Sequence, residues 1–431
     1  MIKKNFILIL FLLFGVNSYS QQYNVNYDEL EINPYSLPSI LTSYGGMNID
    51  NIDDWEKFRK QEIFNSFVSN IYGRVPGDID TMRIITKESD GEAFDGIAKR
   101  KQLTLVLEEN SRKIWIDLLI YLPKTDKKVP VFLGYNFFGN HTITDDQGVG
   151  ITNSWVPKRP NLGMNSNNAS EESRRIMKNR WSIEKIIKAG YGLVTLYCGD
   201  IDPDKADFND GVHSLFYAKN QETPSPDEWG TIAAWSWGLS RIMDYLEVDE
   251  EIDDEKVIVF GHSRLGKVAL WTAASDNRFA ACIANNSGCM GAALSKRNFG
   301  ETVEVVNKAF PHWFCGNFKK YSNNEDLLPL DQHMLLALIA PRPLYVASAS
   351  EDLWADPKGE FLSIKHASVV YNLYGIHGFS SSEMPKINSP VIDVVSYHIR
   401  AGKHDVTEFD WEQYITFASK NLTEKTEITK K

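Results

Sequence analysis

The stretch KVIVFGHSRLGKVALWTAAS, residues 256–275, decides the fold. Its first part is an apolar run that ends in Gly261, His262 and Ser263, and its second part has the pattern of a helix that begins directly after the turn. A serine on such a strand-to-helix turn has an exposed hydroxyl, and backbone N–H groups of the helix start point toward an oxyanion that develops beside it. We therefore predict that Ser263 is a nucleophile, although Gly266 comes one position later than in the usual G-x-S-x-G pattern.

The segments on both sides of this stretch alternate between strand and helix patterns. Residues 228–247 carry a single apolar stripe at helical spacing, and RKQLTLVLEE with RKIWIDLLIYLP predicts an opening antiparallel pair. The remaining strand candidates are short, nearly continuous apolar runs, typical of strands buried on both faces; they are VPVFLGYNF (129–137), YGLVTLYCGD (191–200), KVIVFGHS (256–263), FAACIANNSG (279–288), RPLYVASAS (342–350) and SVVYNLYG (368–375). Such alternation builds a mostly parallel sheet with helices on its faces. The sequence thus predicts the α/β class, an α/β-hydrolase fold with three layers around a mostly parallel central sheet.

The chain divides into four segments. Residues 1–20 have two lysines, an apolar run of about eleven residues and then small polar residues, which is the order of a secretory signal and is too short for the roughly 20 residues of a membrane span. Residues 21–80 are predicted to be an N-terminal extension that packs on the main domain, residues 81–425 the catalytic domain, and residues 426–431 a tail. We expect export to the periplasm or the medium; a retained membrane anchor is the alternative.

Composition and charge exclude several partners. The net charge of −11 becomes −13 without Lys3 and Lys4, because 44 basic and 57 acidic residues remain. Nucleic acids and anionic membranes need a basic face, so we expect neither nucleic-acid binding nor membrane binding in the mature form. The four cysteines have no metal-binding spacing, and buried free thiols are favoured over a disulfide framework. No metal or cofactor is predicted, and we expect a monomer.

The base that activates the serine should follow the last core strand, since the chain order in this fold is serine, acid, histidine. His377 is predicted to be this base, because it lies in YGIHG directly after the apolar run at residues 368–375. A surface-loop histidine is the alternative interpretation. His398 and His404 come later, in a region predicted to be helical, and His262 adjoins the serine itself.

The acid should follow the preceding strand. RPLYVASAS is followed by Glu351, Asp352, Leu353, Trp354, Ala355 and Asp356. Asp352 has the position that a tight turn requires, and a carboxylate there would hold the imidazole in its productive tautomer. Asp356 is the competitor, although its place before Pro357 is typical of a helix cap, and Glu351 is a third choice.

These residues resemble carbohydrate esterase family fifteen, the glucuronoyl esterases, in its bacterial branch. The family nucleophile lies in G-x-S-R-x-G-K, which is matched here by the heptad at 261–267. The similarity extends over about residues 80–420 through YNFFGNH, YCGDIDPD, EWGTIAAWSWG, EDLWADPKGEF and YGIHG. It implies an α/β-hydrolase that cleaves esters between 4-O-methyl-glucuronic acid on xylan and lignin alcohols.

The resemblance also implies roles for single residues. Arg264 would stabilise the oxyanion, Lys267 would hydrogen-bond sugar hydroxyls, and Glu301 and Trp354 would line the uronate pocket. The sequence departs from many members, notably fungal ones, at Asn286, which stands where they carry a catalytic Glu. An amide cannot balance an imidazolium, so the acid role would fall on Asp352, as in bacterial relatives.

The predicted reaction is hydrolysis of glucuronate esters, with xylan fragments or small uronate esters as substrates, through a Ser-His-Asp triad and an acyl-enzyme. An acetyl xylan esterase or another carbohydrate deacetylase on the same fold is the alternative, since it would use the same triad with a smaller acyl pocket. An inactive sugar-binding protein is the alternative from another functional class.

Overall fold

The computed structural model describes residues 25–77 and 79–422. The predicted signal segment at 1–20 and the predicted tail at 426–431 lie outside these residues. In the described part, no helix combines the length and apolarity that crossing a bilayer would require. The four cysteines are all buried free thiols, as predicted.

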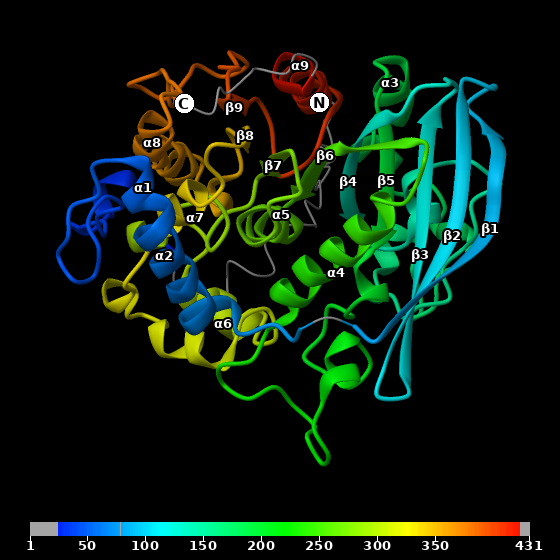
Figure 1. Ribbon diagram of the computed structural model, residues 1–431, viewed down its shortest axis with the longest axis horizontal. Coiled ribbons are helices and arrows are strands. Elements are labelled where there is room, and N and C mark those ends of the chain that lie inside the picture. Colours follow the sequence, from blue (N-terminus) through cyan, green and yellow to red (C-terminus); the bar gives the residue numbers. More distant parts are fainter. Residues whose placement is uncertain (1–24, 78, 423–431) are drawn as a thin grey trace, which may run out of the picture.

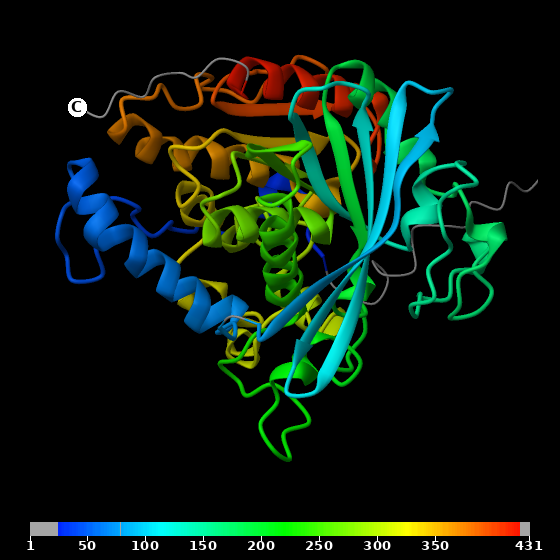
Figure 2. The same cartoon turned by 45° about the vertical axis from the view of Figure 1, so that its right-hand side comes forward.

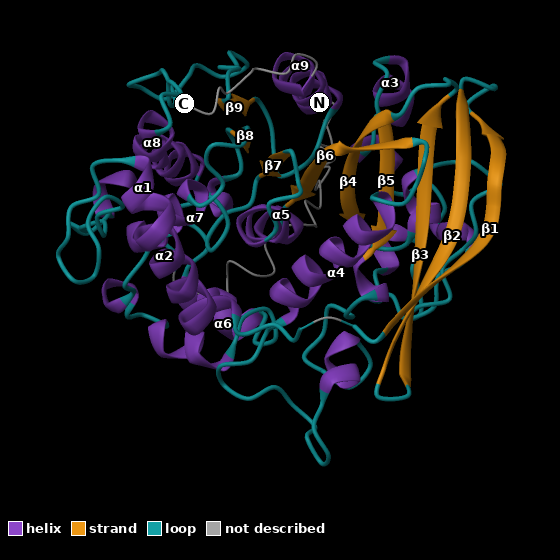
Figure 3. Cartoon of the chain, in the orientation of Figure 1, coloured by secondary structure: helices purple, strands orange, loops and turns teal. Residues whose placement is uncertain are grey.

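A nine-stranded sheet runs through the centre of the molecule in the order β1-β2-β3-β5-β4-β6-β7-β8-β9 (Figures 1 and 3). From β4 to β9 all neighbours are parallel, and β4 also pairs in parallel with β5, whereas β1, β2, β3 and β5 are joined by antiparallel pairing. The strands are β1 (Thr81–Ala93), β2 (Ala98–Glu109), β3 (Arg112–Pro123), β4 (Val129–Asn136), β5 (Gly192–Tyr197), β6 (Ile252–His262), β7 (Ala281–Asn285), β8 (Leu344–Ala349) and β9 (Val395–Arg400). The predicted mostly parallel sheet and the opening antiparallel pair are confirmed.

Helices cover both faces of this sheet. One apolar cluster joins α3 and α9 to side chains such as Phe132 and Phe260, and a larger cluster on the other face includes α4, α5, α7 and α8. The helices are α1 (Ile52–Asp54), α2 (Lys60–Phe67), α3 (Ile183–Lys188), α4 (Thr231–Leu246), α5 (Arg264–Ser275), α6 (Val303–Ala309), α7 (Gln332–Ala337), α8 (Pro357–Leu373) and α9 (Glu408–Leu422). Because the side chains of residues 257–260 in β6 alternate between the two clusters, this part of the strand is buried on both faces, which is why its sequence VIVF is apolar throughout.

The N-terminal helices lie on the side of the molecule opposite β1–β3 (Figures 1 and 2). Helical turns at 55–59 and 68–72 continue α1 and α2, so residues 52–72 are helical throughout. Tyr72 stacks on Trp271 of α5 with ring centroids 3.9 Å apart, and Phe64 stacks on the same indole at 5.2 Å. Residues 52–72 therefore pack directly against the helix that follows Ser263.

Two features of the last third of the chain differ from the prediction. Residues 368–375 do not form a strand: residues 368–373 belong to α8, which begins at Pro357 with the Asp356 side chain capping the N–H of Gly359. The last strand is β9, which lies in a region predicted to be helical. The apolar run at 368–375 is one face of a buried helix, and periodicity over a run this short does not separate a helix from a strand.

Candidate active site

Ser263 lies on a strained turn between β6 and α5. Its backbone has φ 59° and ψ −132°, a conformation that L-residues rarely adopt and that is held only where the surroundings enforce it. The turn needs glycine on both sides, since a Cβ at Gly261 would lie 1.9 Å from the carbonyl oxygen of Leu265 and one at Gly266 would lie 2.9 Å from the Cβ of Ser287. The predicted strand-turn-helix context of the serine is confirmed.

The start of α5 lies beside the serine hydroxyl. The carbonyl oxygen of Ser263 accepts hydrogen bonds from the N–H groups of Gly266 and Lys267, at 2.8 and 3.3 Å. The first N–H groups of a helix have no partners within the helix, and among the described residues those of Arg264 and Leu265 have no other backbone partner, so they can bind a ligand. Together with the positive end of the helix dipole, they can stabilise an anion next to the serine.

Asp352 lies three residues beyond the end of β8 and is 5% exposed. Its Oδ2 atom accepts two hydrogen bonds, from Nδ1 of His404 at 2.6 Å and from Nδ2 of Asn286 at 2.7 Å. The two competing carboxylates are placed differently. Asp356 caps α8 and forms an ion pair with Arg297 at 2.8 Å, and Glu351 is exposed to solvent. Asp352 is thus the acidic side chain of this segment that holds an imidazole.

The imidazole on Asp352 belongs to His404 and not to His377. His404 lies four residues after β9, with 36% of its side chain exposed. His377 is exposed on the loop after α8, and within the described residues no hydrogen bond joins it to Asp352. The prediction that His377 follows the last core strand is therefore wrong, because the segment before it is a helix and β9 comes later.

His404 lies in ring-to-ring contact with His262, the residue before Ser263. The ring of His262 lies 4.5 Å from that of His404, and its Nδ1 is bonded to Oδ1 of Asn285 at 2.6 Å. Burial, followed by the neighbouring His404, lowers the pKa of His262 well below its ordinary value. His262 is consequently a neutral support under the His404 ring, and this contact brings His404 to the nucleophile turn.

Arg264 extends from the first position of α5 with 20% of its side chain exposed. Its Nε lies 2.8 Å from Oδ2 of Asp204, an ion-pair contact without the alignment of a hydrogen bond. The guanidinium lies 4.7 Å from the ring centre of Phe137 and 5.9 Å from that of Trp313, so it is held between two aromatic side chains.

Lys267 uses all of its donors inside the protein. Its Nζ is bonded to the carbonyl oxygens of Ser287 and Cys289 at 2.7 and 2.5 Å, and to Oε2 of Glu301 at 2.7 Å. An ammonium has three N–H groups, so Lys267 is fully engaged. Glu301 is also tied to the half-buried Trp354 by a backbone hydrogen bond of 2.8 Å. The structure therefore links Lys267, Glu301 and Trp354, while their contact with a sugar stays a prediction.

A buried carboxyl behind the site was not singled out in the sequence. Glu360 of α8 accepts hydrogen bonds at Oε1 from the N–H groups of Ser287 and Gly288, at 2.7 and 3.0 Å, and at Oε2 from Ser348 at 2.6 Å. Burial raises its pKa to about 7. The Glu360 side chain thereby holds the turn that carries Asn286. No local signal distinguishes this glutamate, because its partners come from two other segments.

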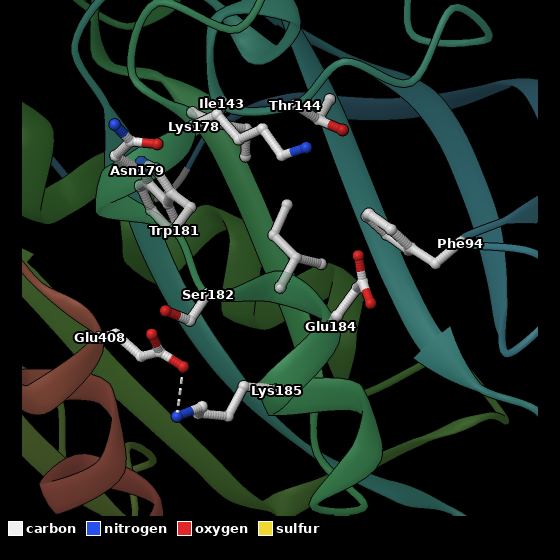
Figure 4. A pocket seen from close by; sticks show the side chains of 11 residues that line it. Phe94, Ile143, Thr144, Lys178, Asn179, Trp181, Ser182, Glu184, Lys185 and Glu408 are labelled. Carbon is white, nitrogen blue, oxygen red and sulfur yellow. Dashed lines mark ion pairs between the residues drawn. The ribbon is translucent and has the colours of Figure 1, made fainter.

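A separate pocket of about 420 Å³ lies beside the start of α3 (Figure 4). Phe94, Lys178 and Glu184 point into it, and Lys185 pairs with Glu408 at its edge at 2.7 Å. None of the residues around Ser263 lines this pocket. Within the described residues, no group of three or more histidine, cysteine, aspartate or glutamate side chains is arranged to hold a metal ion.

Comparison with known proteins identifies relatives of this chain. The family model for fungal glucuronyl esterases matches residues 164–375. A curated relative from an unknown prokaryotic organism, the carbohydrate esterase MZ0003, is 48% identical over 94% of this chain and 94% of its own length.

Two solved structures are similar over the whole fold. One is described as a promiscuous CE15 esterase from a marine bacterial metagenome; it is 47% identical, with a TM-score of 0.86 over 92% of this chain and 100% of its own. The other is a glucuronoyl esterase from Solibacter usitatus, 43% identical, with a TM-score of 0.86 over 91% of this chain and 100% of its own.

Proposed function

Because the chain belongs to carbohydrate esterase family 15, the glucuronoyl esterases, and is therefore a carboxylic ester hydrolase, we propose that it hydrolyses esters of 4-O-methyl-glucuronic acid with Ser263 as nucleophile, His404 as base and Asp352 as acid. The observation that carries this assignment is the 2.6 Å bond between His404 and Asp352 beside the nucleophile turn. His404 takes the place that the sequence alone assigned to His377.

The reaction is an acyl transfer in two steps. The Nδ1–H of His404 donates to Asp352, which leaves Nε2 to accept the hydroxyl proton of Ser263 as the serine attacks the ester carbonyl. The oxyanion is stabilised by the free N–H groups at the start of α5 and by the Arg264 guanidinium. His404 then protonates the leaving alcohol, and water hydrolyses the glucuronoyl-enzyme in the same way.

The uronate is expected to bind beside Glu301 and Trp354. Lys267 occupies Oε2 of Glu301, so Oε1 is the oxygen that can accept hydrogen bonds from sugar hydroxyls. The half-buried indole of Trp354 offers an apolar face to a sugar ring. Lys267 in this proposal orients Glu301, and glucuronate esters on xylan fragments, including those with lignin alcohols, are the substrate class.

The test compares His404→Ala with His377→Ala on benzyl or methyl glucuronate. We expect His404→Ala and Ser263→Ala to lose about 10³-fold or more in kcat, whereas His377→Ala, the matched control, stays within about twofold because its side chain is exposed. A fluorophosphonate should label Ser263 in the wild type and in His377→Ala, and should label His404→Ala much more slowly. Full activity of His404→Ala would refute the proposed triad. Absence of labelling at Ser263 in the wild type would instead indicate an inactive sugar-binding protein.

A second substrate class deserves the same assay, because the solved relative at 47% identity is described as promiscuous. A carbohydrate acetyl ester would use the same triad and oxyanion donors, and only the acyl pocket would differ. We therefore expect slower turnover of an acetylated xyloside than of the methyl glucuronate ester. The reverse order would replace the uronate assignment with deacetylation and keep the fold and the triad.

We further propose that residues 1–20 direct export, to the periplasm or the medium, and that the mature protein is a monomer. N-terminal sequencing of the protein recovered outside the cytoplasm should begin near residue 21, and light scattering should give the mass of one chain. Recovery of a protein that still carries residues 1–20 would contradict the cleavage.

A further inference from the structure

The partly buried carboxylate of Asp204 connects Arg264 with the adjacent side chains of His312 and Trp313. Asp204 lies in the segment after β5, and its side chain is 14% exposed. Oδ2 faces Nε of Arg264 at 2.8 Å, and Oδ1 accepts hydrogen bonds from Nε2 of His312 at 2.9 Å and from Nε1 of Trp313 at 2.8 Å. Burial raises the pKa of Asp204, but Arg264, His312 and Trp313 outweigh it and hold this pKa below its ordinary value. The group is thus anionic across the neutral pH range.

We propose that Asp204 is the positioning residue for Arg264, holding its guanidinium where the oxyanion forms; this rests on the proposed esterase function. The side chain of an arginine has about 2 kcal/mol of rotamer entropy to lose when it is ordered. Here the cost is met before substrate binds, because Asp204 holds one edge of the guanidinium. Preorganised donors of this kind need no reorientation during the reaction.

The geometry leaves the reactive edge of Arg264 free. Asp204 contacts Nε, and among the residues that the structure describes neither Nη1 nor Nη2 of Arg264 makes a hydrogen bond. A guanidinium has four N–H groups on these two atoms. Asp204 also orients the ring of Trp313 that lies 5.9 Å from the guanidinium. The same carboxylate therefore sets both the charge contact and one of the two rings that flank the arginine.

Charge balance gives an independent reason for Asp204. Arg264 and Lys267 both lie in the first turn of α5, where a cation is unfavourable because of the helix dipole. Glu301 balances Lys267 within the protein, and Asp204 balances Arg264. A permanent partner for Arg264 is required before any substrate anion has formed, so the oxyanion alone cannot supply the compensation.

A double-mutant cycle tests this assignment on the full chain. Asp204→Asn keeps an acceptor for His312 and Trp313 and presents an amide instead of a charge to Arg264. We expect it to lower kcat by about 10- to 100-fold, a part of the 10²–10³-fold that one oxyanion donor provides, with KM changed less than about threefold. In an Arg264→Ala background the same substitution should change kcat by less than about twofold. Equal losses in both backgrounds would overturn the proposal.

Chemical rescue gives a readout that a purely structural role would not move. Added methylguanidinium should restore part of the kcat of Arg264→Ala, and the restored fraction should fall at least about fivefold when Asp204 is replaced by Asn, because the ion-pair site is lost. Rescue that is indifferent to Asp204 would overturn the proposal. If Asp204→Asn does not fold, as judged by circular dichroism, His312→Phe keeps a ring and removes one bond to Asp204 without changing either ring that flanks Arg264, and the cycle with Arg264→Ala is run on that variant with the same criterion.

The choice of ester separates this inference from the proposed function. The cycle is measured on methyl glucuronate and on 4-nitrophenyl acetate, since an oxyanion forms with both. If the wild type cleaves only the acetate, the uronate assignment is wrong. The double-mutant cycle on the acetate then still supports or overturns the role of Asp204. Absence of cleavage of both esters by the wild type would overturn both proposals together.

Discussion

Replacing Lys267 with methionine tests what this lysine does in the folded protein. Its side chain is 3% exposed, that of Glu301 is 6% exposed, and three bonds of 2.5–2.7 Å join the ammonium to Glu301 and to two backbone carbonyl oxygens. Methionine has a similar length and packs in apolar surroundings, so the substitution removes the charge and the donors without opening a large cavity. It leaves a buried carboxylate with no counter-charge.

The expected loss of stability is large for one substitution. Removal of one partner from a buried ion pair costs about 3–5 kcal/mol because the remaining charge stays desolvated. The two carbonyl oxygens lose a charged donor, and one such hydrogen bond contributes about 1.5–3 kcal/mol. These terms overlap, so we expect Lys267→Met to lower the free energy of unfolding by about 3–5 kcal/mol. Adding Glu301→Leu removes the orphaned charge and should recover at least about 2 kcal/mol.

Urea unfolding followed by tryptophan fluorescence measures these differences, with the exposed pair of Lys308 and Glu304 as the control. Lys308 is 60% exposed, and Lys308→Met should change the free energy of unfolding by less than about 0.5 kcal/mol. A loss below about 1 kcal/mol for Lys267→Met, within the range of an exposed pair, would refute the structural role. If KM rises at the same time, the lysine acts on the sugar, as the resemblance implies.

Three further substitutions test the neighbourhood of the serine. Asn286→Asp places a second carboxylate about 2.7 Å from Asp352, and because the added negative charge favours the protonated form of the His404 base, the acidic limb of the kcat/KM–pH profile should move upward by about one unit or more; an unmoved limb would contradict this contact. Gly261→Ala puts a methyl group 1.9 Å from a carbonyl oxygen of Leu265, so the yield of soluble, fluorophosphonate-labelled protein should collapse, and a normal yield would contradict the geometry. Burial raises the pKa of Glu360 to about 7, so the folded state binds more protons than the unfolded state between about pH 4.5 and 7. The free energy of unfolding should therefore fall as pH rises through this window, by up to about 3 kcal/mol. Glu360→Gln should remove this part of the slope in urea unfolding measured from pH 5 to 8, and an unchanged slope would contradict the assignment.

The nucleophile turn could be predicted because its signals are local. An apolar run, a glycine, a serine and a helical pattern follow one another within residues 256–275, and the observed α5 spans Arg264–Ser275 as the sequence indicated. Buried parallel strands have apolar side chains on both faces, so β4 to β8 were visible as runs of such residues. The assignment of Asp352 as the acid followed from its position three residues after the end of β8.

The base could not be found in the same way, because β9 does not look like a buried strand. Its sequence VSYHIR contains His398 and Arg400, yet every residue in it is buried. The side chains of His398 and Arg400 both hydrogen-bond to Asp410 of α9, at 2.9 and 2.7 Å. This compensation comes from another element and has no signature in the strand itself. Without β9, the apolar face of α8 has the pattern of a last strand, and His377 is the histidine that follows it.

A carboxylate that holds His404 could follow β7, at position 286, or β8, at position 352. The structure explains why the one after β8 is used. Strands β7 and β8 are parallel and in register, with Asn285 opposite Ala347, so both end at the same edge of the sheet. Asn286, just beyond β7, donates its amide N–H to the Oδ2 atom that also receives His404. The Asn286 amide gives Oδ2 a second hydrogen bond, whereas a carboxylate at this position would present another acceptor to it. An amide at 286 therefore completes the hydrogen bonding of the single carboxylate at 352 that holds His404.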